Sequence, residues 1–296
     1  MISPLRFPTA LHREVADLAR DFFSAQAHVD TILVVNSCAR GRAVAGSDLD
    51  MAVLITPTAP SQEVQSLTMK WNQFMATQSV VHRFRSTGRF TQVHVDVFDG
   101  RMTPTVWDDG GGPDSFEVEI GNRIAYAAPL QDAGTYFREV QSRWLPYYGD
   151  DLRLSRLAMV REACARDLDA IPFFLGRSLY FQAFDRLYKA LQEFLQALFL
   201  ARRTYPLAYN KWIREQVAEW LSLPDLYEEL PPILSIGSIE SAELGQKADA
   251  LRVLLERWTC LGAQDREAAQ PGAAPNGGLA TPVANSEVTE GPPSVS

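Results

Sequence analysis

Apolar and polar residues alternate with a clear period in the first part of the chain, and the period predicts where helices and strands lie. Residues 9–28 carry apolar side chains at steps of three and four, so we expect an amphipathic helix with Thr9 as its N-cap. Residues 31–35 are apolar and β-branched, which predicts a short buried strand. A short helix over 38–45 and a second strand over 51–55 are expected to follow.

Beyond the second strand the pattern predicts one more helix, over residues 61–76, and then a hairpin. The runs 79–85 and 90–98 are rich in strand-forming residues and flank a glycine, so we interpret them as its two strands. Residues 107–115 include consecutive glycines, but no Lys-Ser or Lys-Thr pair follows, so a surface loop is expected there rather than a phosphate loop. The chain should then return to the sheet and form a helix over 132–144.

From about residue 150 the strand signals disappear and a helical period takes over. We expect helices over 151–170, 176–203, 207–222 and 240–261. The predicted fold class is therefore an α/β domain, with a mixed sheet and flanking helices, followed by an all-α helical bundle. The domain limits are placed at 1–145 and 146–262, and the tail 263–296, which is rich in proline and small residues, is expected to be disordered.

Composition narrows the classes of partner. Hydrophobic residues make up 46% of the 296 residues, and no run reaches the roughly eighteen apolar residues that span a bilayer. The first residues contain no apolar signal-peptide core, so we expect a cytoplasmic protein without a membrane partner. A formal net charge of −8 disfavours a long nucleic acid, and the three separated cysteines suit reduced thiols.

The candidate chemistry begins at two acidic residues that precede the second strand. Asp48 and Asp50 lie two positions apart, so their side chains project from the same face of the strand. Paired carboxylates of this kind suit Mg²⁺, which completes its shell with substrate phosphates. Ser37 and the amides after it precede the short helix and are expected to face an anion. The alternative is that Asp48 caps a turn and Asp50 is a solvated strand end.

These residues form one longer string, Ser37-x-Ala39-Arg40-Gly41-x-Ala43-x-x-x-Ser47-Asp48-x-Asp50. The string resembles the signature of the nucleotidyltransferase superfamily typified by DNA polymerase β and the kanamycin nucleotidyltransferases. It departs from that signature at Asn36, where glycine is usual, and asparagine tolerates a glycine-like backbone better than most residues. The resemblance covers residues 31–55.

The resemblance implies a set of roles beyond the first two acids. It implies that two Mg²⁺ ions and ATP bind, and that Ser37, Arg40, Gly41 and Ser47 hold the triphosphate. It also implies a third catalytic and metal-binding carboxylate in an alternating strand, and Asp96 is the matching position. The alternative for Asp96 is a strand residue paired with Arg83 or Arg85, and His94 on the same face is interpreted as a neighbour.

Two lysines of the helical part are candidates for nucleotide binding. The resemblance implies that Lys189 reaches the triphosphate, whereas its spacing with Asp185 and Glu193 is also typical of a solvated helix face. Lys211 lies in the aromatic-rich segment 205–212, which we expect either to contact base or phosphate or to plug the space between helices.

The predicted reaction is the Mg²⁺-dependent transfer of a nucleoside monophosphate, foremost AMP from ATP, to an acceptor hydroxyl with release of pyrophosphate. The acceptor is expected to be a small molecule or a protein, and the acidic charge makes a cationic small molecule plausible. The alternative is a regulatory or antitoxin-like module of the same fold that binds nucleotide with little turnover.

Overall fold

The computed structural model describes residues 5–104 and 110–260. The chain up to Cys260 forms one compact unit. The proposed limits of the α/β and helical domains within this unit stay a prediction. The expected disorder of 263–296 and the beginning of the expected loop 107–115, residues 107–109, lie outside the described residues.

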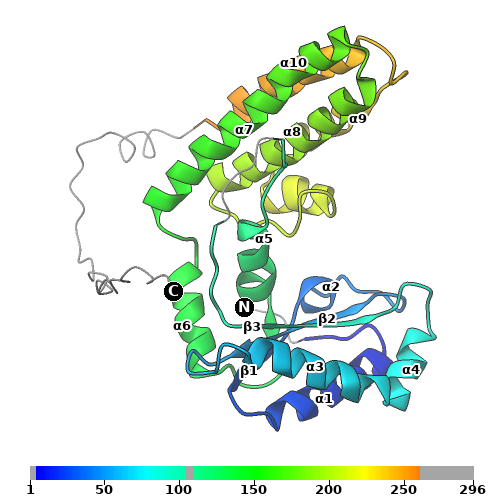
Figure 1. Cartoon of the computed structure of the whole chain (residues 1–296), viewed down its shortest axis with the longest axis vertical. Helices are drawn as coiled ribbons and strands as arrows, with labels where there is room; N and C mark the ends of the chain where they lie inside the picture. The colour runs from blue at the N-terminus through cyan, green and yellow to red at the C-terminus, as the bar shows by residue number, and fades with distance from the viewer. Residues whose placement is uncertain (1–4, 105–109, 261–296) are drawn as a thin grey trace, which may run out of the picture. The chain divides into compact units, whose positions relative to one another are not determined.

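A small mixed sheet of four strands confirms the expected sheet type. The strands are β1 Val29–Val34, β2 Leu49–Ile55, β3 Val93–Phe98 and β4 Ala128–Pro129, in the order β3-β2-β1-β4. β1 runs antiparallel to both β2 and β4, whereas β2 and β3 are parallel (Figure 1). The parallel pair places Asp50 beside His94 and Ala52 beside Asp96.

The hairpin expected over 79–98 is wrong, because its first half is a helix. α3 Glu63–Ala76 leads into α4 Ser79–Arg85, and only the second half forms a strand. Val81 and Phe84, three residues apart, are both buried against the core. A parallel strand pair needs a crossover connection, and α3 and α4 together supply it.

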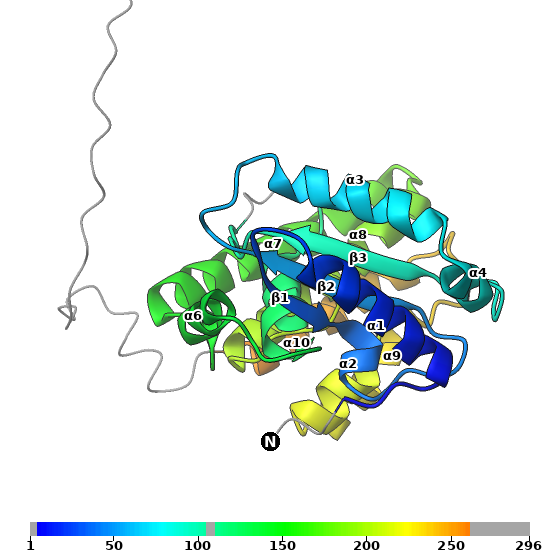
Figure 2. The same cartoon turned by 90° about the horizontal axis from the view of Figure 1, so that it is seen from below.

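Helices α1 Ala10–Ser24 and α3 cover one face of the sheet (Figure 2). Thr9 caps α1 as expected, because its hydroxyl accepts a hydrogen bond from the amide of His12 at 3.2 Å. Alternate strand residues, such as Ile32 and Met51, form the core with these helices. The side chains of Asp50, His94 and Asp96 therefore project from the opposite face.

A short helix with a π-helical second half leads back to the sheet. α5 Phe116–Ile120 continues as the π-helix η1 Gly121–Ala125, and β4 follows directly. The expected return to the sheet over 115–130 is thus confirmed only at its end. The helix expected over 132–144 is α6 Thr135–Trp144. The carboxylate of Asp30, in β1, accepts hydrogen bonds from two amides in the first turn of α6 at 3.1 and 2.9 Å.

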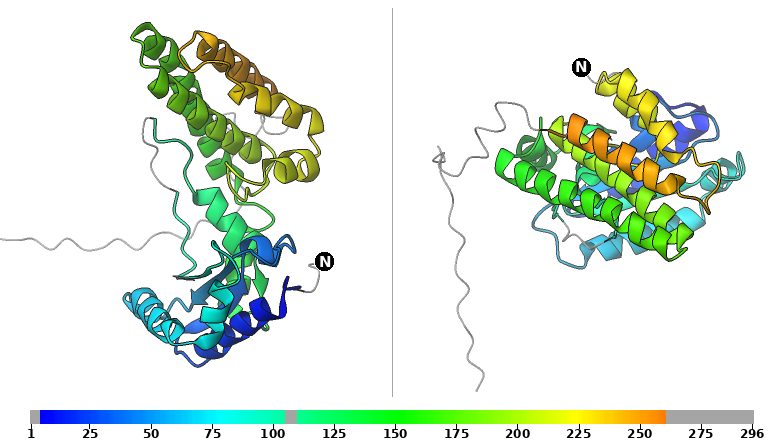
Figure 3. Two further views of the ribbon diagram at one scale, coloured as in Figure 1. Left: turned by 90° about the vertical axis from the view of Figure 1, so that its right-hand side faces the viewer. Right: turned by 90° about the horizontal axis from the view of Figure 1, so that it is seen from above.

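The remaining described chain is helical, as expected, but the bounds differ. The helices are α7 Asp150–Gly176, α8 Tyr180–Ala201, η2 Glu215–Trp220, α9 Pro224–Leu234 and α10 Glu243–Trp258. α7, α8 and α10 pack side by side (Figure 3). The helix expected over 207–222 is wrong at its start, where the chain is irregular. α9 was not predicted, and it contains Pro231 and Pro232, a residue type that disfavours helix interiors.

None of the helices in the described ranges is long and apolar enough to cross a membrane.

Gly121 of η1 packs tightly against the backbone of the segment 205–212. A Cβ at this position would lie 2.5 Å from the carbonyl oxygen of Pro206. We expect Gly121→Ala to lower the free energy of unfolding by about 1–3 kcal/mol, since the backbone must shift to relieve the overlap. Urea unfolding measures this. The control is Gly176→Ala, where the added methyl meets nothing within 4 Å, and equal stability of the two variants would contradict the expectation.

Candidate functional site

A pocket of about 280 Å³ opens between the start of β2 and the irregular segment before η2. Six of the residues predicted to bind or react line it: Ser37, Arg40, Ser47, Asp48, Asp50 and Lys211. Gly41, Asp96 and Lys189 do not. The lining residues that were not anticipated in this role are Gly46, Phe90 and Asn122, together with Asn36, which was noted only for its backbone. Leu207, Ala208 and Trp212 belong to the segment 205–212, for which contact with base or phosphate was one of the two expected roles. The pocket therefore joins the signature segment to residues more than a hundred positions later in the chain.

The segment before β2 is a tight loop with a very short helix. α2 spans only Asn36–Ala39, so the helix expected over 38–45 is wrong. Two features end it early: Gly41 has a φ of 67°, and the carbonyl of Ser37 accepts from the amides of Arg42 and Ala43 at 2.9 and 3.2 Å. Asn36 has a φ of 55°, which confirms the glycine-like backbone expected at this departure from the signature.

One carboxylate oxygen of Asp48 and one of Asp50 contact residues 92 and 94, at the start of β3. Asp48 Oδ1 accepts from the amide of Gln92 at 2.7 Å, and Asp50 Oδ1 lies 3.0 Å from His94 Nδ1. The side chain of Asp48 therefore contacts the chain next to β3 and does not cap a turn around itself. The Asp50 side chain is 21% exposed. Among the residues that the structure describes, no hydrogen bond or ion pair involves the second oxygen of either carboxylate.

Asp96 shares the face of Asp50 but lies outside the pocket. Its carboxylate is 67% exposed and pairs with Arg123 of η1 at 3.6 Å. The alternative partners expected for it are wrong, because Arg83 pairs with Glu14 and Arg85 contacts Met75. Its role as third ligand and base stays a prediction.

The two carboxylates, Asp48 and Asp50, suit one mode of magnesium binding, in which the protein supplies only part of the ligand set. Within residues 5–104 and 110–260 no three His, Cys, Asp or Glu side chains are grouped closely enough to cage a metal ion. Mg²⁺ commonly uses only one or two carboxylates and takes its other ligands from water and substrate phosphates. Asp48 and Asp50 suit such a substrate-completed ion.

Arg40 connects the two walls of the pocket. Its Nη1 lies 2.5 Å from Glu215 Oε1, and both side chains are less than 10% exposed. Its guanidinium also lies 5.0 Å from the ring centroid of Trp212 and 5.9 Å from that of Trp220. Arg40 is thus a structural link in addition to a pocket residue, and the expected contact with nucleotide stays a prediction.

The opposite wall, residues 207–212, is fixed by buried amide side chains. Gln216 is fully buried and accepts from the amide of Leu207 at 2.6 Å while donating to the carbonyls of Ala208 and Lys211 at 2.9 and 3.0 Å. Asn122 of η1 donates to the carbonyl of Leu207 at 2.9 Å. This wall is therefore preorganised.

Different residues of the aromatic-rich segment 205–212 match the two expected roles, the plug between helices and the lining of the pocket. Tyr205 and Tyr209 are buried, and Tyr205 donates to the carbonyl of Trp144 at 2.7 Å, so these rings act as the interhelical plug. Burial raises the pKa of the Tyr205 phenol, which stays protonated. Lys211 and Trp212, in contrast, line the pocket. No ion pair of Lys211 occurs among the residues that the structure describes.

Lys189 and Glu193 do not form one solvated stripe. Lys189 Nζ pairs with Asp185 at 2.8 Å, the carbon stem of Lys189 lies close to Gly112, and Lys189 does not line the pocket. Glu193 is fully buried, so the solvated-face interpretation is wrong for it. Burial, and then the charge of Asp167, raises the pKa of Glu193 to about 8.

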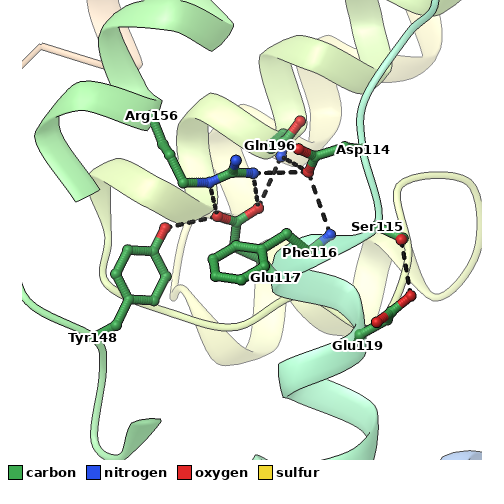
Figure 4. A network of polar contacts seen from close by, with 8 residues as sticks. All are labelled: Asp114, Ser115, Phe116, Glu117, Glu119, Tyr148, Arg156 and Gln196. Carbon is green, nitrogen blue, oxygen red and sulfur yellow. Dashed lines mark hydrogen bonds and ion pairs between the residues drawn. The ribbon is translucent and has the colours of Figure 1, made fainter. Parts of the chain in front are cut away.

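A buried polar network anchors the start of α5 to the long helices (Figure 4). Glu117 is fully buried and accepts from Arg156 Nε at 2.6 Å, from Tyr148 at 2.6 Å and from Gln196 at 2.8 Å. Asp114 accepts from Arg156 Nη2 at 2.7 Å. The described end of 107–115 is irregular and half-buried or exposed, in agreement with the expected surface loop, and the ion pair between Asp114 and Arg156 ties it to α7.

Comparison of the chain with known protein families and with curated proteins gives no match. The resemblance to nucleotidyltransferases stays an expectation that depends on the signature residues 31–55.

Proposed function

We propose that this protein is a Mg²⁺-dependent nucleotidyltransferase that transfers a nucleoside monophosphate, foremost AMP from ATP, to an acceptor hydroxyl. One observation carries the proposal: Ser37, Asp48 and Asp50 of the signature segment line the same pocket as Lys211. Two carboxylates that each keep one oxygen without a partner among the described residues, a hydroxyl and an ammonium are groups that suit a metal-bound triphosphate. The mixed sheet followed by helices is consistent with the two-domain arrangement of 1–145 and 146–262.

The chain's own residues would act mainly by positioning. Asp48 and Asp50 would hold Mg²⁺, which supplies positive charge to the phosphates when it is bound. Lys211 would neutralise a further phosphate oxygen, and Ser37 would donate its hydroxyl to another. The acceptor oxygen would bond to the α-phosphorus as the bond to the leaving pyrophosphate breaks, and the acceptor proton passes to a base or to water. Whether Asp96 is that base stays a prediction.

Asparagine substitutions at the two acids test the proposal. With Mg·ATP and a panel of hydroxyl acceptors, we expect Asp48→Asn and Asp50→Asn each to reduce pyrophosphate release by at least about a hundredfold, since each removes a charge at the reacting phosphates. Asp99→Asn is the matched control, because Asp99 follows β3 outside the pocket. Turnover that survives both pocket substitutions would refute the proposal.

A second function has one specific observation in its favour. Asp96 faces Arg123 and lies outside the pocket, and a pure nucleotide-binding module has no need of a third acid. Such a regulatory or antitoxin-like module would bind Mg·ATP in calorimetry without releasing pyrophosphate. Binding accompanied by turnover on any acceptor would exclude it.

A further inference from the structure

Trp212 adopts a backbone conformation that its side chain disfavours. Its φ is 60°, in the left-handed region, where a bulky residue other than glycine is a genuine outlier. Two of the described non-glycine residues with positive φ, Asn36 and Trp212, line the same pocket. Strained conformations of this kind concentrate at ligand sites.

The fold does not use Trp212 as a core residue. Its side chain is 43% exposed, whereas Tyr205 and Tyr209 of the same segment are buried. Its ring lies over the guanidinium of Arg40, and the carbonyl of Trp212 accepts from the amide of Gln216 at 2.9 Å. The surrounding structure thus holds an exposed indole ring in one orientation at the pocket.

The groups around Trp212 indicate the chemistry of its ligand. The neighbouring Lys211 has no ion pair within the described ranges, whereas the charge of Arg40 is matched by Glu215. An ammonium next to a supported aromatic surface suits a ligand that carries both an anion and a planar ring. Leu207 and Ala208 add apolar surface to the same wall.

We propose that Trp212 is the stacking platform for the nucleobase of the nucleoside triphosphate, with Lys211 meeting its phosphates. This inference rests on the proposed function, and it adds a preference. Stacking tolerates any base but increases with ring area, so purine triphosphates bind more tightly than pyrimidine ones, and ATP and GTP bind within a few-fold of each other.

The test measures the contribution of the base to binding apart from that of the phosphates. Binding of Mg·ATP and of magnesium tripolyphosphate is measured by calorimetry for the wild type, Trp212→Gly, Trp212→Asn and Lys211→Met. We expect both Trp212 variants to bind ATP on the order of ten- to a hundredfold more weakly and tripolyphosphate within about twofold of the wild type. Lys211→Met should weaken both ligands. Because glycine and asparagine suit the left-handed backbone, the unfolding temperature should not fall.

The controls distinguish failure of this inference from failure of the proposed function. Phe181→Ala removes an exposed aromatic side chain that does not line the pocket and should leave both affinities unchanged. ATP affinity that is unchanged in the Trp212 variants would overturn the stacking role alone. A fall in the affinity for both ligands, together with a lower unfolding temperature, would make Trp212 a structural residue. A wild type that binds neither ligand would remove the proposed function as well.

Discussion

Replacement of Arg156 by methionine is expected to lower the free energy of unfolding by about 3–5 kcal/mol. Arg156 is 3% exposed and is shared between two carboxylates, with contacts of 2.6 Å to Glu117 and 2.7 Å to Asp114. Methionine matches the aliphatic stem of arginine but lacks the guanidinium, so both acids would remain in place without their cation. Burial alone would lower the pKa of Arg156, and the hydrogen bonds and charges of Glu117 and Asp114 reverse this and raise it.

The same substitution on the surface of the same helix is the control. Arg166 pairs with Glu162 at 3.2 Å, and both side chains are about half exposed or more, so Arg166→Met should cost less than about 1 kcal/mol. Chemical denaturation at neutral pH measures both variants. Equal costs would show that the buried network contributes no more than an exposed ion pair.

This network also bears on the geometry of the site. Glu117 lies on α5, which continues into η1, and η1 carries Asn122, whose side chain holds the carbonyl of Leu207 in the pocket wall. Tyr126 at the end of η1 donates to the carbonyl of Tyr205 at 2.6 Å. A shift of α5 in the Arg156 variant would therefore displace the wall that carries Lys211. Weaker nucleotide binding is the expected secondary effect.

Local patterns predicted correctly that Ser37, Asp48 and Asp50 lie close together. The alternation around Asp48 and Asp50 placed both carboxylates on one face of β2, and Asn36 showed the expected left-handed backbone. Local patterns failed where two structures compete over a short run. Residues 79–85 have strand-forming side chains, but Val81 and Phe84 also suit one helical face, and the crossover between parallel strands selects the helix.

The other half of the site is made by contacts between distant residues. Arg40 and Glu215 are 175 positions apart, and Glu117 and Arg156 are 39 apart. Neither pair has a spacing that a helix or strand period would reveal. Glu193 lies four residues after Lys189, which in an exposed helix predicts solvation, and only the packing of α7 against α8 buries it.

Glu193 leads to the second large effect, a dependence of stability on pH. Its pKa is about 8 in the folded protein, against an ordinary value of 4.5, because burial and the charge of Asp167 oppose ionisation. The cations of Arg186, Arg166 and Lys189 only partly offset this. Below about pH 4.5 the carboxyl is protonated in both states. Between pH 4.5 and about 8 the Glu193 carboxyl is ionised in the unfolded chain and protonated in the folded protein. The free energy of unfolding therefore falls as the pH rises through this range, and it levels off above about pH 8.

We expect Glu193→Gln to remove this loss, because the amide resembles the neutral carboxyl in size and cannot ionise. The variant should match the wild type or be slightly less stable near pH 4.5, and should exceed it by about 4 kcal/mol at pH 8, as 1.36 kcal/mol per pKa unit implies. Denaturation curves from pH 4.5 to 8.5 measure the free energy of unfolding of both proteins. Taking the difference between the two proteins at each pH removes the contribution of all other titrating groups. Glu228→Gln, on an exposed position of α9, should follow the wild-type curve. A constant difference between Glu193→Gln and wild type at every pH would show that Glu193 is already ionised in the folded protein.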